Sequence, residues 1–191
     1  EFEQALRIEE AFGGGFAGVD VFFVISGFLI TATIIEETTA GILSLRTVYE
    51  RRARRLLPAL FTVLAVSTIV AANLFIAEDF RKFAQALAAS VLFGANLLYA
   101  REVGYFDDDE GFQPLLHMWS LSVEEQFYLL FPILIAILVA RRPAWLKPAI
   151  LVTLVASLGL SVAMIPLNPQ FAFFMLPTRA WELMIGAACA T

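Results

Sequence analysis

The sequence predicts an all-α bundle of membrane-spanning helices, and two observations predict it. Hydrophobic residues make up 60% of the 191-residue chain and charged residues only 16%, whereas soluble domains average about 45–50% and about 25%. Apolar windows of about 20 residues, which is the length that crosses a bilayer as a helix, recur along the chain. We therefore expect one multispanning integral membrane domain over residues 1–191, with five to six hydrophobic segments.

The hydrophobic segments follow one another without an internal repeat. The windows expected to enter the bilayer are 17–35, 56–77, 84–100, 123–140, 148–166 and a last one that begins near Arg179. The third window is the weakest, because it contains Gln85, Ser90, Gly94 and Asn96. A polar, glycine-containing segment is tolerated at membrane depth only where protein surrounds it or it lines a cavity.

The basic residues of the connecting segments predict the orientation. The segments 36–55 and 141–147 are both rich in arginine and lysine, which places both on the cytoplasmic side. Three windows separate them, and an odd number of crossings cannot return to the same side. We therefore expect 84–100 to be re-entrant or interfacial, and 101–118 to be extracytoplasmic.

Composition also limits the kinds of partner that we expect for this chain. The basic residues gather at 46–55 without forming a broad basic face, so we expect the lipid bilayer and no nucleic acid as a partner. A single cysteine, Cys189, excludes an intrachain disulfide. We expect no bound metal.

An acidic residue, Asp20, lies four positions into the first apolar window. One explanation is structural, because a carboxylate near a helix N-terminus meets free N–H groups and the positive end of the helix dipole. The other is functional, because intramembrane acids are costly and face a polar cavity or a cationic partner. The two explanations are compatible, and the sequence does not choose between them.

The arginine-rich run RRARR precedes the second window. Its members are Arg51, Arg52, Arg54 and Arg55. They could anchor the next helix at an anionic membrane surface, or their guanidinium groups could bind the phosphates of a cytoplasmic donor such as a coenzyme A thioester. Composition alone favours anchoring.

The stretch LLHMWSLSVEEQFYLLFP places two glutamates at the head of an apolar run. Ser122 and Glu125 have the spacing of a capping box, which predicts a helix that starts at Ser122. Glu124 is then left without a structural role, on the same helix face as Tyr128. The chain's only histidine, His117, lies before the predicted cap. A carboxylate near an imidazole can tune a histidine that acts as a general base. A single histidine without positioned partners, however, does not define a catalytic site.

The segment PTRAWELMIG opens the last window. Arg179 and Glu182 are three residues apart and can pair on one helix face. Trp181 between them is an ordinary interfacial anchor. Structural roles are therefore the leading explanation of these residues.

With these residues collected, the sequence resembles acyltransferase family 3, the integral membrane O-acyltransferases of lipopolysaccharide, peptidoglycan and other exported glycans. The stretches that carry the resemblance are GGFAGVDVFFVISGFLIT, YERRARRLLPAL, PLLHMWSLSVEEQFYLLFP and LPTRAWELMIGA. The residues of these stretches and their order are specific, and the stretches extend along nearly the whole chain, from residue 14 to residue 187.

The resemblance implies transfer of an acyl group, expected to be acetyl, from cytoplasmic acyl-coenzyme A to a sugar hydroxyl on the outer side of a bacterial inner membrane. Arg52 and Arg55 match the R-x-x-R element at the donor, where Arg51 and Arg54 are expected to help. Glu124 and Glu125 match the S-x-x-x-E-E-Q-F-Y element, which implies an acid at the outer mouth of the active-site cavity.

The expected roles divide into two groups. The residues expected to be catalytic are Glu124, Asp20 and His117. Those expected to contact the substrate are Trp119, Ser120, Tyr128, Arg179 and Glu182.

One departure from the family pattern concerns its first span, which carries the histidine that usually serves as the acyl-transfer base. Residues 1–12 are EFEQALRIEEAF, with no apolar span and no histidine, and the family's later spans are also missing. The sequence therefore favours a truncated product, a fragment or a non-catalytic relative that does not turn over alone. A partner-binding scaffold or a glycan or lipid-intermediate transporter is the alternative, although no paired repeat halves support transport.

Overall fold

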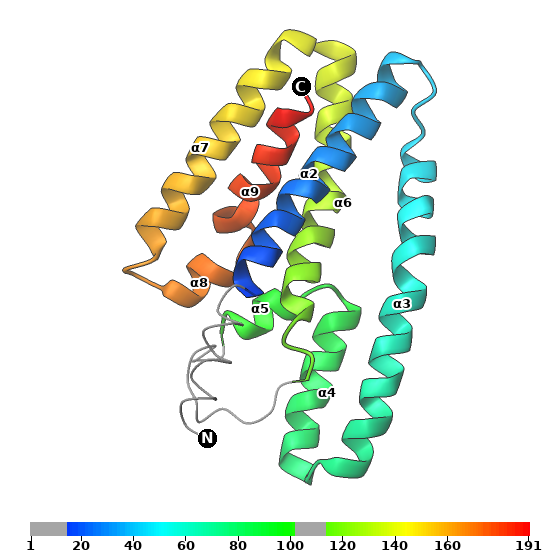
Figure 1. Ribbon diagram of the computed structural model, residues 1–191, viewed down its shortest axis with the longest axis vertical. Coiled ribbons are helices and arrows are strands. Elements are labelled where there is room, and N and C mark those ends of the chain that lie inside the picture. Colours follow the sequence, from blue (N-terminus) through cyan, green and yellow to red (C-terminus); the bar gives the residue numbers. More distant parts are fainter. Residues whose placement is uncertain (1–14, 102–113) are drawn as a thin grey trace.

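A computed structural model describes residues 15–101 and 114–191, and in these ranges the secondary structure is helical, without strands (Figure 1). The elements are α2 (Gly15–Thr39), α3 (Leu45–Leu74), α4 (Ala77–Val91), α5 (Ala95–Tyr99), α6 (Met118–Arg141), the 3-10 helix η1 (Pro143–Trp145), α7 (Leu146–Met164), α8 (Pro169–Phe174) and α9 (Leu176–Cys189). The predicted all-α class is confirmed.

Four segments of the described residues are long and apolar enough to cross a membrane. They are Gly18–Thr39, Leu45–Leu74, Met118–Arg141 and Pro143–Met164, which correspond to α2, α3, α6 and η1 with α7. Large apolar side chains such as Leu129 and Val152 are exposed on these helices, as expected of surfaces that face lipid. The chain is therefore an integral membrane protein, and its described residues contain four candidate spans.

The window 84–100 is divided between α4 and α5. The break falls at Phe93, whose φ of 52° is left-handed, and at Gly94, which precedes α5. A bulky residue adopts this backbone conformation only where the surroundings impose it. Among the described residues, only α3 and α6 are then candidate spans between the two basic segments, an even number. The α2–α3 and α6–α7 connections lie at the same end of the bundle (Figure 1).

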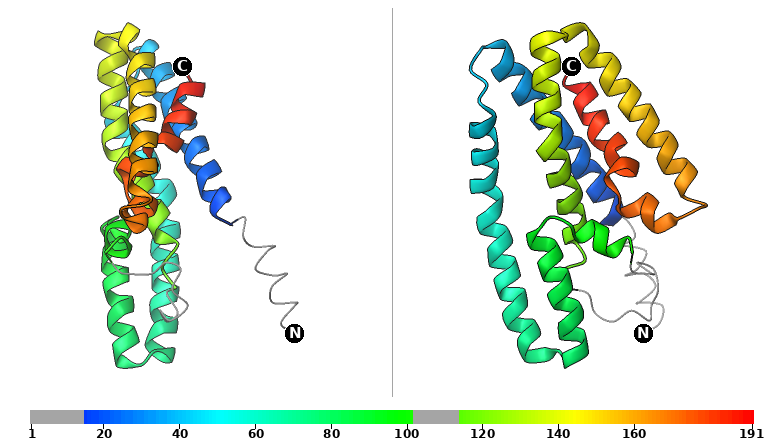
Figure 2. Two further views of the ribbon diagram at one scale, coloured as in Figure 1. Left: turned by 90° about the vertical axis from the view of Figure 1, so that its left-hand side faces the viewer. Right: turned by 180° about the vertical axis from the view of Figure 1, so that it is seen from behind.

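The helices form two layers when seen edge-on. Helices α2 and α9 lie together on one side of a layer that contains α3, α4, α6 and α7 (Figure 2). Two glycines allow α2 and α9 to approach closely, because a Cβ on Gly27 would lie 1.9 Å from the Leu183 carbonyl oxygen and one on Gly186 would lie 1.9 Å from that of Val24. Helix α2 is thus held against α9 on one side and α6 on the other.

The predicted capping box is wrong. Helix α6 already begins at Met118, with His117 at the N-cap position and no side-chain cap. Ser122 lies in the second turn, where its hydroxyl donates to the Met118 carbonyl oxygen (2.9 Å) and accepts from the Ala95 amide (3.2 Å). The serine therefore joins α6 to α5, and Glu125 is free to bind elsewhere.

Candidate functional site

Five polar residues from three helices meet inside the bundle, and we call them the Arg52 cluster. The members are Ser26 from α2, Arg52 from α3, and Glu124, Glu125 and Tyr128 from α6. The Nη2 atom of Arg52 lies 3.1 Å from Glu124 Oε1, and its Nε donates to Glu125 Oε1 at 2.6 Å. One guanidinium therefore bridges both glutamates.

The aromatic ring of Tyr128 completes the Arg52 cluster. The guanidinium carbon of Arg52 lies 3.2 Å from the ring centroid, a cation–π contact. The Tyr128 hydroxyl donates to the backbone oxygen of Ser26 at 3.0 Å. Glu124 and Tyr128, four residues apart, share one face of α6 as their spacing predicted, and Tyr128 ties that face to α2.

The carboxylate of Glu124 is almost completely buried, with 4% of the residue exposed. Burying a charge is tolerated when the group is paired and hydrogen-bonded. Glu124 meets both conditions, because Oε1 accepts from the Ser26 hydroxyl and faces Arg52. A carboxylate in contact with a hydroxyl can take its proton, and a nearby guanidinium can stabilise the negative charge that develops during acyl transfer.

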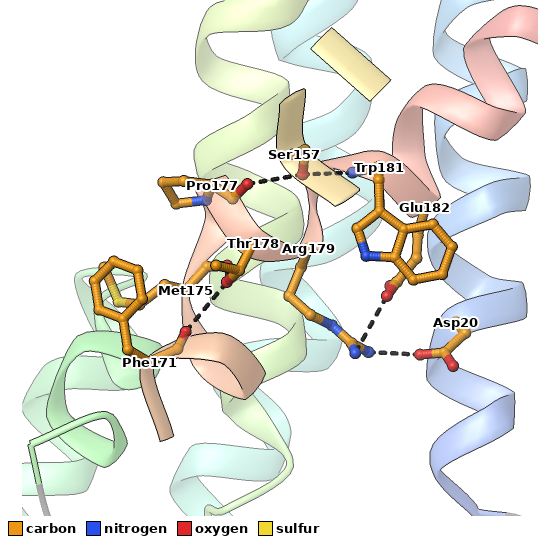
Figure 3. Close-up of polar contacts among 9 residues, drawn as sticks. All are labelled: Asp20, Ser157, Phe171, Met175, Pro177, Thr178, Arg179, Trp181 and Glu182. Carbon is orange, nitrogen blue, oxygen red and sulfur yellow. Dashed lines mark hydrogen bonds and ion pairs between the residues drawn. The ribbon is translucent and has the colours of Figure 1, made fainter. Parts of the chain in front are cut away.

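A second charged group, the Arg179 cluster, joins the other side of α2 to α9 (Figure 3). Its members are Asp20, Arg179 and Glu182. The Nη2 of Arg179 donates to Asp20 Oδ1, and Nη1 lies 3.2 Å from Glu182 Oε1. The predicted Arg179–Glu182 pair is confirmed. Asp20 lies beyond the first turn of α2, which carries no acidic residue, so the cationic partner explains it better than the helix dipole.

Helix α9 is positioned by α7 as well as by α2. The Ser157 hydroxyl on α7 donates to the Pro177 carbonyl oxygen (2.7 Å) and accepts from the Trp181 amide (2.9 Å), as Figure 3 shows. Pro177 occupies the first turn of α9, where its missing N–H costs nothing. These contacts set the rotation of α9 and with it the direction in which Arg179 points.

The Arg179 cluster is polar but incompletely hydrogen-bonded. The side chain of Glu182 is 1% exposed and that of Asp20 is 43% exposed, so the cluster runs from the surface into the helix interface. Within the described part of the chain, neither carboxylate oxygen of Glu182 has a hydrogen-bond partner. The same holds for Nε of Arg179 and Nε1 of Trp181. Buried polar atoms in this state are uncommon in folded proteins.

Aromatic rings surround the Arg179 guanidinium. Its central carbon lies 5.4 Å from the ring centroid of Phe173, 5.7 Å from that of Trp119 and 5.9 Å from that of Phe23. Trp119 itself is buried and lies edge-on to Phe23. Three helices and α8 therefore contribute to one cationic, aromatic environment.

His117 and Ser120, which we expected at the site, lie outside both clusters. His117 is exposed, and its carbonyl oxygen accepts from the Ser120 hydroxyl at 3.1 Å. Glu124 follows His117 by seven residues, which is about 10 Å along a helix. The structure does not bring the histidine to the buried carboxylate.

The four arginines of the RRARR run are not equivalent. Arg51 pairs with Glu37 on α2, and Arg54 pairs with Glu50 one turn earlier on α3. Arg55 is exposed and has no ion pair within residues 15–101 and 114–191. The R-x-x-R element is therefore divided between a partly buried, ion-paired member, Arg52, and an exposed member, Arg55.

Two expectations conflict at the Arg52 cluster. We expected Arg52 on the cytoplasmic side and Glu124 at the outer mouth, yet their side chains lie 3.1 Å apart. Both cannot hold, because atoms in contact share one depth in the membrane. The basic element and the acidic element instead form a single site.

Sequence reasoning missed Ser26 and the pair Asn96 and Gln126. Gln126 donates to Asn96 Oδ1 (2.7 Å) and to the Phe93 carbonyl oxygen (2.9 Å), which fixes the broken segment α4–α5 against α6. Asn96 is fully buried, and its polarity inside an apolar window was the available signal. Ser26 gave no signal, because a single serine in a membrane helix usually bonds its own backbone.

A helix bundle with four candidate spans and two partly buried ion clusters defines an integral membrane protein with polar groups between its helices. The chain belongs to acyltransferase family 3, since the model of this acyltransferase domain matches residues 3–191. It is 42% identical over 137 residues to an uncharacterized protein of Haemophilus influenzae, and 36% identical over 183 residues to the O-acetyltransferase OatA of Staphylococcus aureus. These alignments cover 72% and 93% of the chain.

The relatives are longer than the chain, which spans 56% of the Haemophilus protein and 30% of OatA. No solved structure matches the chain. Within the described residues, no group of three or more histidine, cysteine, aspartate or glutamate side chains could hold a metal ion.

Proposed function

We propose that the chain forms the reacting part of a membrane O-acyltransferase, which moves an acetyl group from acetyl-coenzyme A to a hydroxyl of an exported cell-envelope glycan. Family membership and the O-acetyltransferase relative support the reaction class. The observation that carries the proposal is the buried carboxylate of Glu124, which contacts both a hydroxyl and a guanidinium. General-base catalysis of acyl transfer needs these groups together.

The donor binds at the exposed arginines of α3. Phosphate groups of coenzyme A need guanidinium groups that are free to form bidentate hydrogen bonds. Arg55 meets this need best, because it has no ion pair in the described residues, while Arg51 and Arg54 are held only by exposed pairs. Arg52 remains in its cluster, where it meets the thioester carbonyl and not the phosphates.

The acceptor binds at the Arg179 cluster. The unsatisfied acceptor atoms of Glu182 suit sugar hydroxyl groups, and the neighbouring Trp119 ring suits the apolar face of a sugar. Asp20 is the exposed entrance to this site. Tyr128 positions the two clusters through α2, and His117 and Ser120 contact more distant parts of the glycan at the start of α6.

The protein resides in a bacterial inner membrane with segment 36–55 in the cytoplasm. Its five arginines support this orientation through the positive-inside rule. The position of the α6–α7 connection at the same end of the bundle agrees, because that connection is basic too (Figure 1).

Membranes from the cell that carries the gene test the proposal, with substitutions made in the gene itself. Acetyl-labelled acetyl-coenzyme A should transfer its label to glycan hydroxyls. Arg55→Gln should raise the KM for the donor about tenfold with little change in kcat, because one charge-assisted hydrogen bond contributes about 1.5–3 kcal/mol. Arg46→Gln is the matched control, since Arg46 is also exposed on α3 but lies outside the R-x-x-R element.

Two results contradict the proposal. Glycan export without consumption of acetyl-coenzyme A would indicate a transporter. Unchanged acetylation after deletion of the gene would indicate a scaffold or partner-binding protein.

A further inference from the structure

The hydroxyl of Ser26 behaves differently from most others on the described helices. A serine or threonine in a membrane helix ordinarily donates to the carbonyl oxygen four residues earlier. Eight residues here do so: Thr31, Thr33, Thr39, Thr62, Thr68, Ser90, Ser122 and Thr153. Ser26 instead donates across the helix interface to the carboxylate of Glu124.

Ser26 lies where two neighbouring helices hold the backbone of α2. The backbone of Ser26 is held by the Tyr128 hydroxyl, which donates to its carbonyl oxygen. The next residue, Gly27, is packed against the α9 backbone at Leu183. The backbone that carries the Ser26 hydroxyl is therefore held by α6 and α9, and a fixed position is what a reacting group requires.

Three side chains with complementary chemical roles lie together around the Ser26 hydroxyl. Ser26 supplies a hydroxyl, Glu124 supplies a carboxylate in contact with it, and Arg52 places a guanidinium 3.1 Å from the same carboxylate oxygen. An activated nucleophile needs an adjacent base, and the oxyanion of an acyl-transfer intermediate needs a fixed positive group. Ser26 is 5% exposed, while the Arg52 side chain is 22% exposed, so the approach to the site passes Arg52.

We propose that Ser26 is a nucleophile that carries the acyl group covalently between donor and acceptor, an inference that rests on the proposed function. In the first step Ser26 Oγ attacks the thioester carbonyl. The Oγ–carbon bond forms, the carbon–sulfur bond breaks, and the Oγ proton passes through Glu124 to the departing thiolate of coenzyme A. Arg52 stabilises the oxyanion.

The second step returns the serine to its starting state. The acceptor hydroxyl attacks the serine ester, its oxygen–carbon bond forms and the Oγ–carbon bond breaks. The acceptor proton passes through Glu124 to Oγ. Ser26 and Asp20 lie on the same helix six residues apart, about 9 Å along its axis, so the ester lies one to two turns from the acceptor cluster.

The test looks for the ester in membranes of the source cell, with the gene at its own locus. The membranes are incubated with acetyl-labelled acetyl-coenzyme A, first without and then with the glycan acceptor, and quenched in acid. We expect label on the peptide that contains Ser26, released by hydroxylamine and by added acceptor. Ser26→Ala should lose the protein-bound label and lower glycan acetylation at least about 100-fold, the scale of losing an activated nucleophile.

Two further variants separate covalent catalysis from a packing effect. Ser26→Cys should carry a thioester in place of the ester, which hydroxylamine releases at neutral pH. Thr31→Val is the matched control, because Thr31 is also buried on α2 but its hydroxyl bonds to its own helix at Gly27. It should keep the label and the acetylation rate.

Undiminished glycan acetylation in Ser26→Ala would overturn the inference and leave the proposed function intact. Lost acetylation in Ser26→Ala together with no ester on the unaltered protein would also overturn it, because Ser26 would then only position Glu124. Absence of donor-dependent acetylation in the unaltered membranes would overturn the proposed function and this inference together.

Discussion

The two charged clusters contain the same kinds of side chain, but they differ in the hydrogen bonds that their carboxylates accept. Each places an arginine between two carboxylates beside α2. In the Arg52 cluster the guanidinium donates to Glu125, and Glu124 accepts from a serine. In the Arg179 cluster the buried Glu182 accepts no hydrogen bond within the described residues. These differences are the basis of our proposal that the first cluster performs the chemistry and the second binds the acceptor.

The largest expected effect is the loss of the bridging cation in the first cluster. Arg52→Met leaves Glu124 and Glu125 without a counter-charge, and breaking a buried pair costs about 3–5 kcal/mol of the free energy of unfolding. Thermal unfolding in detergent measures this. Arg54→Met is the control, because its pair with Glu50 is exposed and contributes about 0.3–0.5 kcal/mol. Equal stability of the two variants would contradict the bridging role.

The second cluster should respond differently to the same change. Arg179→Met should destabilise the fold by about 3 kcal/mol, the lower end of the range for breaking a buried pair, because Asp20 is partly solvated. Adding Glu182→Leu should restore most of that loss, since replacing a buried ion pair with apolar residues is often neutral or stabilising. Adding Glu124→Leu to Arg52→Met should not restore stability, because Glu125 stays charged. A double-mutant cycle in each cluster measures the difference.

The sequence predicted more of the fold than of the site. The all-α class and the weakness of 84–100 followed from hydropathy, because a bilayer demands long apolar helices. The Arg179–Glu182 pair followed from spacing on one helix. The contacts between helices could not be predicted from the sequence. Glu125 was assigned to a helix cap, and nothing in the order of residues along the chain placed Arg52 beside it. Such pairings depend on helix rotation, which Ser157 and the glycines set.

A smaller effect is expected where α2 meets α9 between the clusters. Gly186→Ala places a methyl group against the Val24 backbone, and overpacking of this kind costs about 1–3 kcal/mol. The added methyl group should displace Glu182, which is one turn away. The affinity for the acceptor should therefore fall, while the affinity for the donor stays unchanged. Gly159→Ala on α7 is the control, since nothing lies within 4 Å of its added Cβ. Equal thermal midpoints for the two variants would argue against the close packing.

The smallest effect is expected at the Tyr128 hydroxyl, which ties α6 to α2. Tyr128→Phe keeps the face that Arg52 contacts and removes the hydrogen bond to Ser26, at a cost of about 1 kcal/mol. Thermal unfolding measures this loss. The acetylation rate should also fall, because Ser26 is less firmly held. A rate equal to that of the unaltered protein would show that Ser26 needs no such support.

The most direct test of the account compares the two adjacent glutamates in the acetylation assay. Glutamine at either position preserves size and hydrogen bonding but cannot accept a proton. Glu124→Gln should lower kcat about 100-fold, the lower end for loss of a general base, whereas Glu125→Gln should lower it less than about tenfold because Glu125 contacts Arg52 and not the hydroxyl. An unchanged kcat in Glu124→Gln would contradict the account.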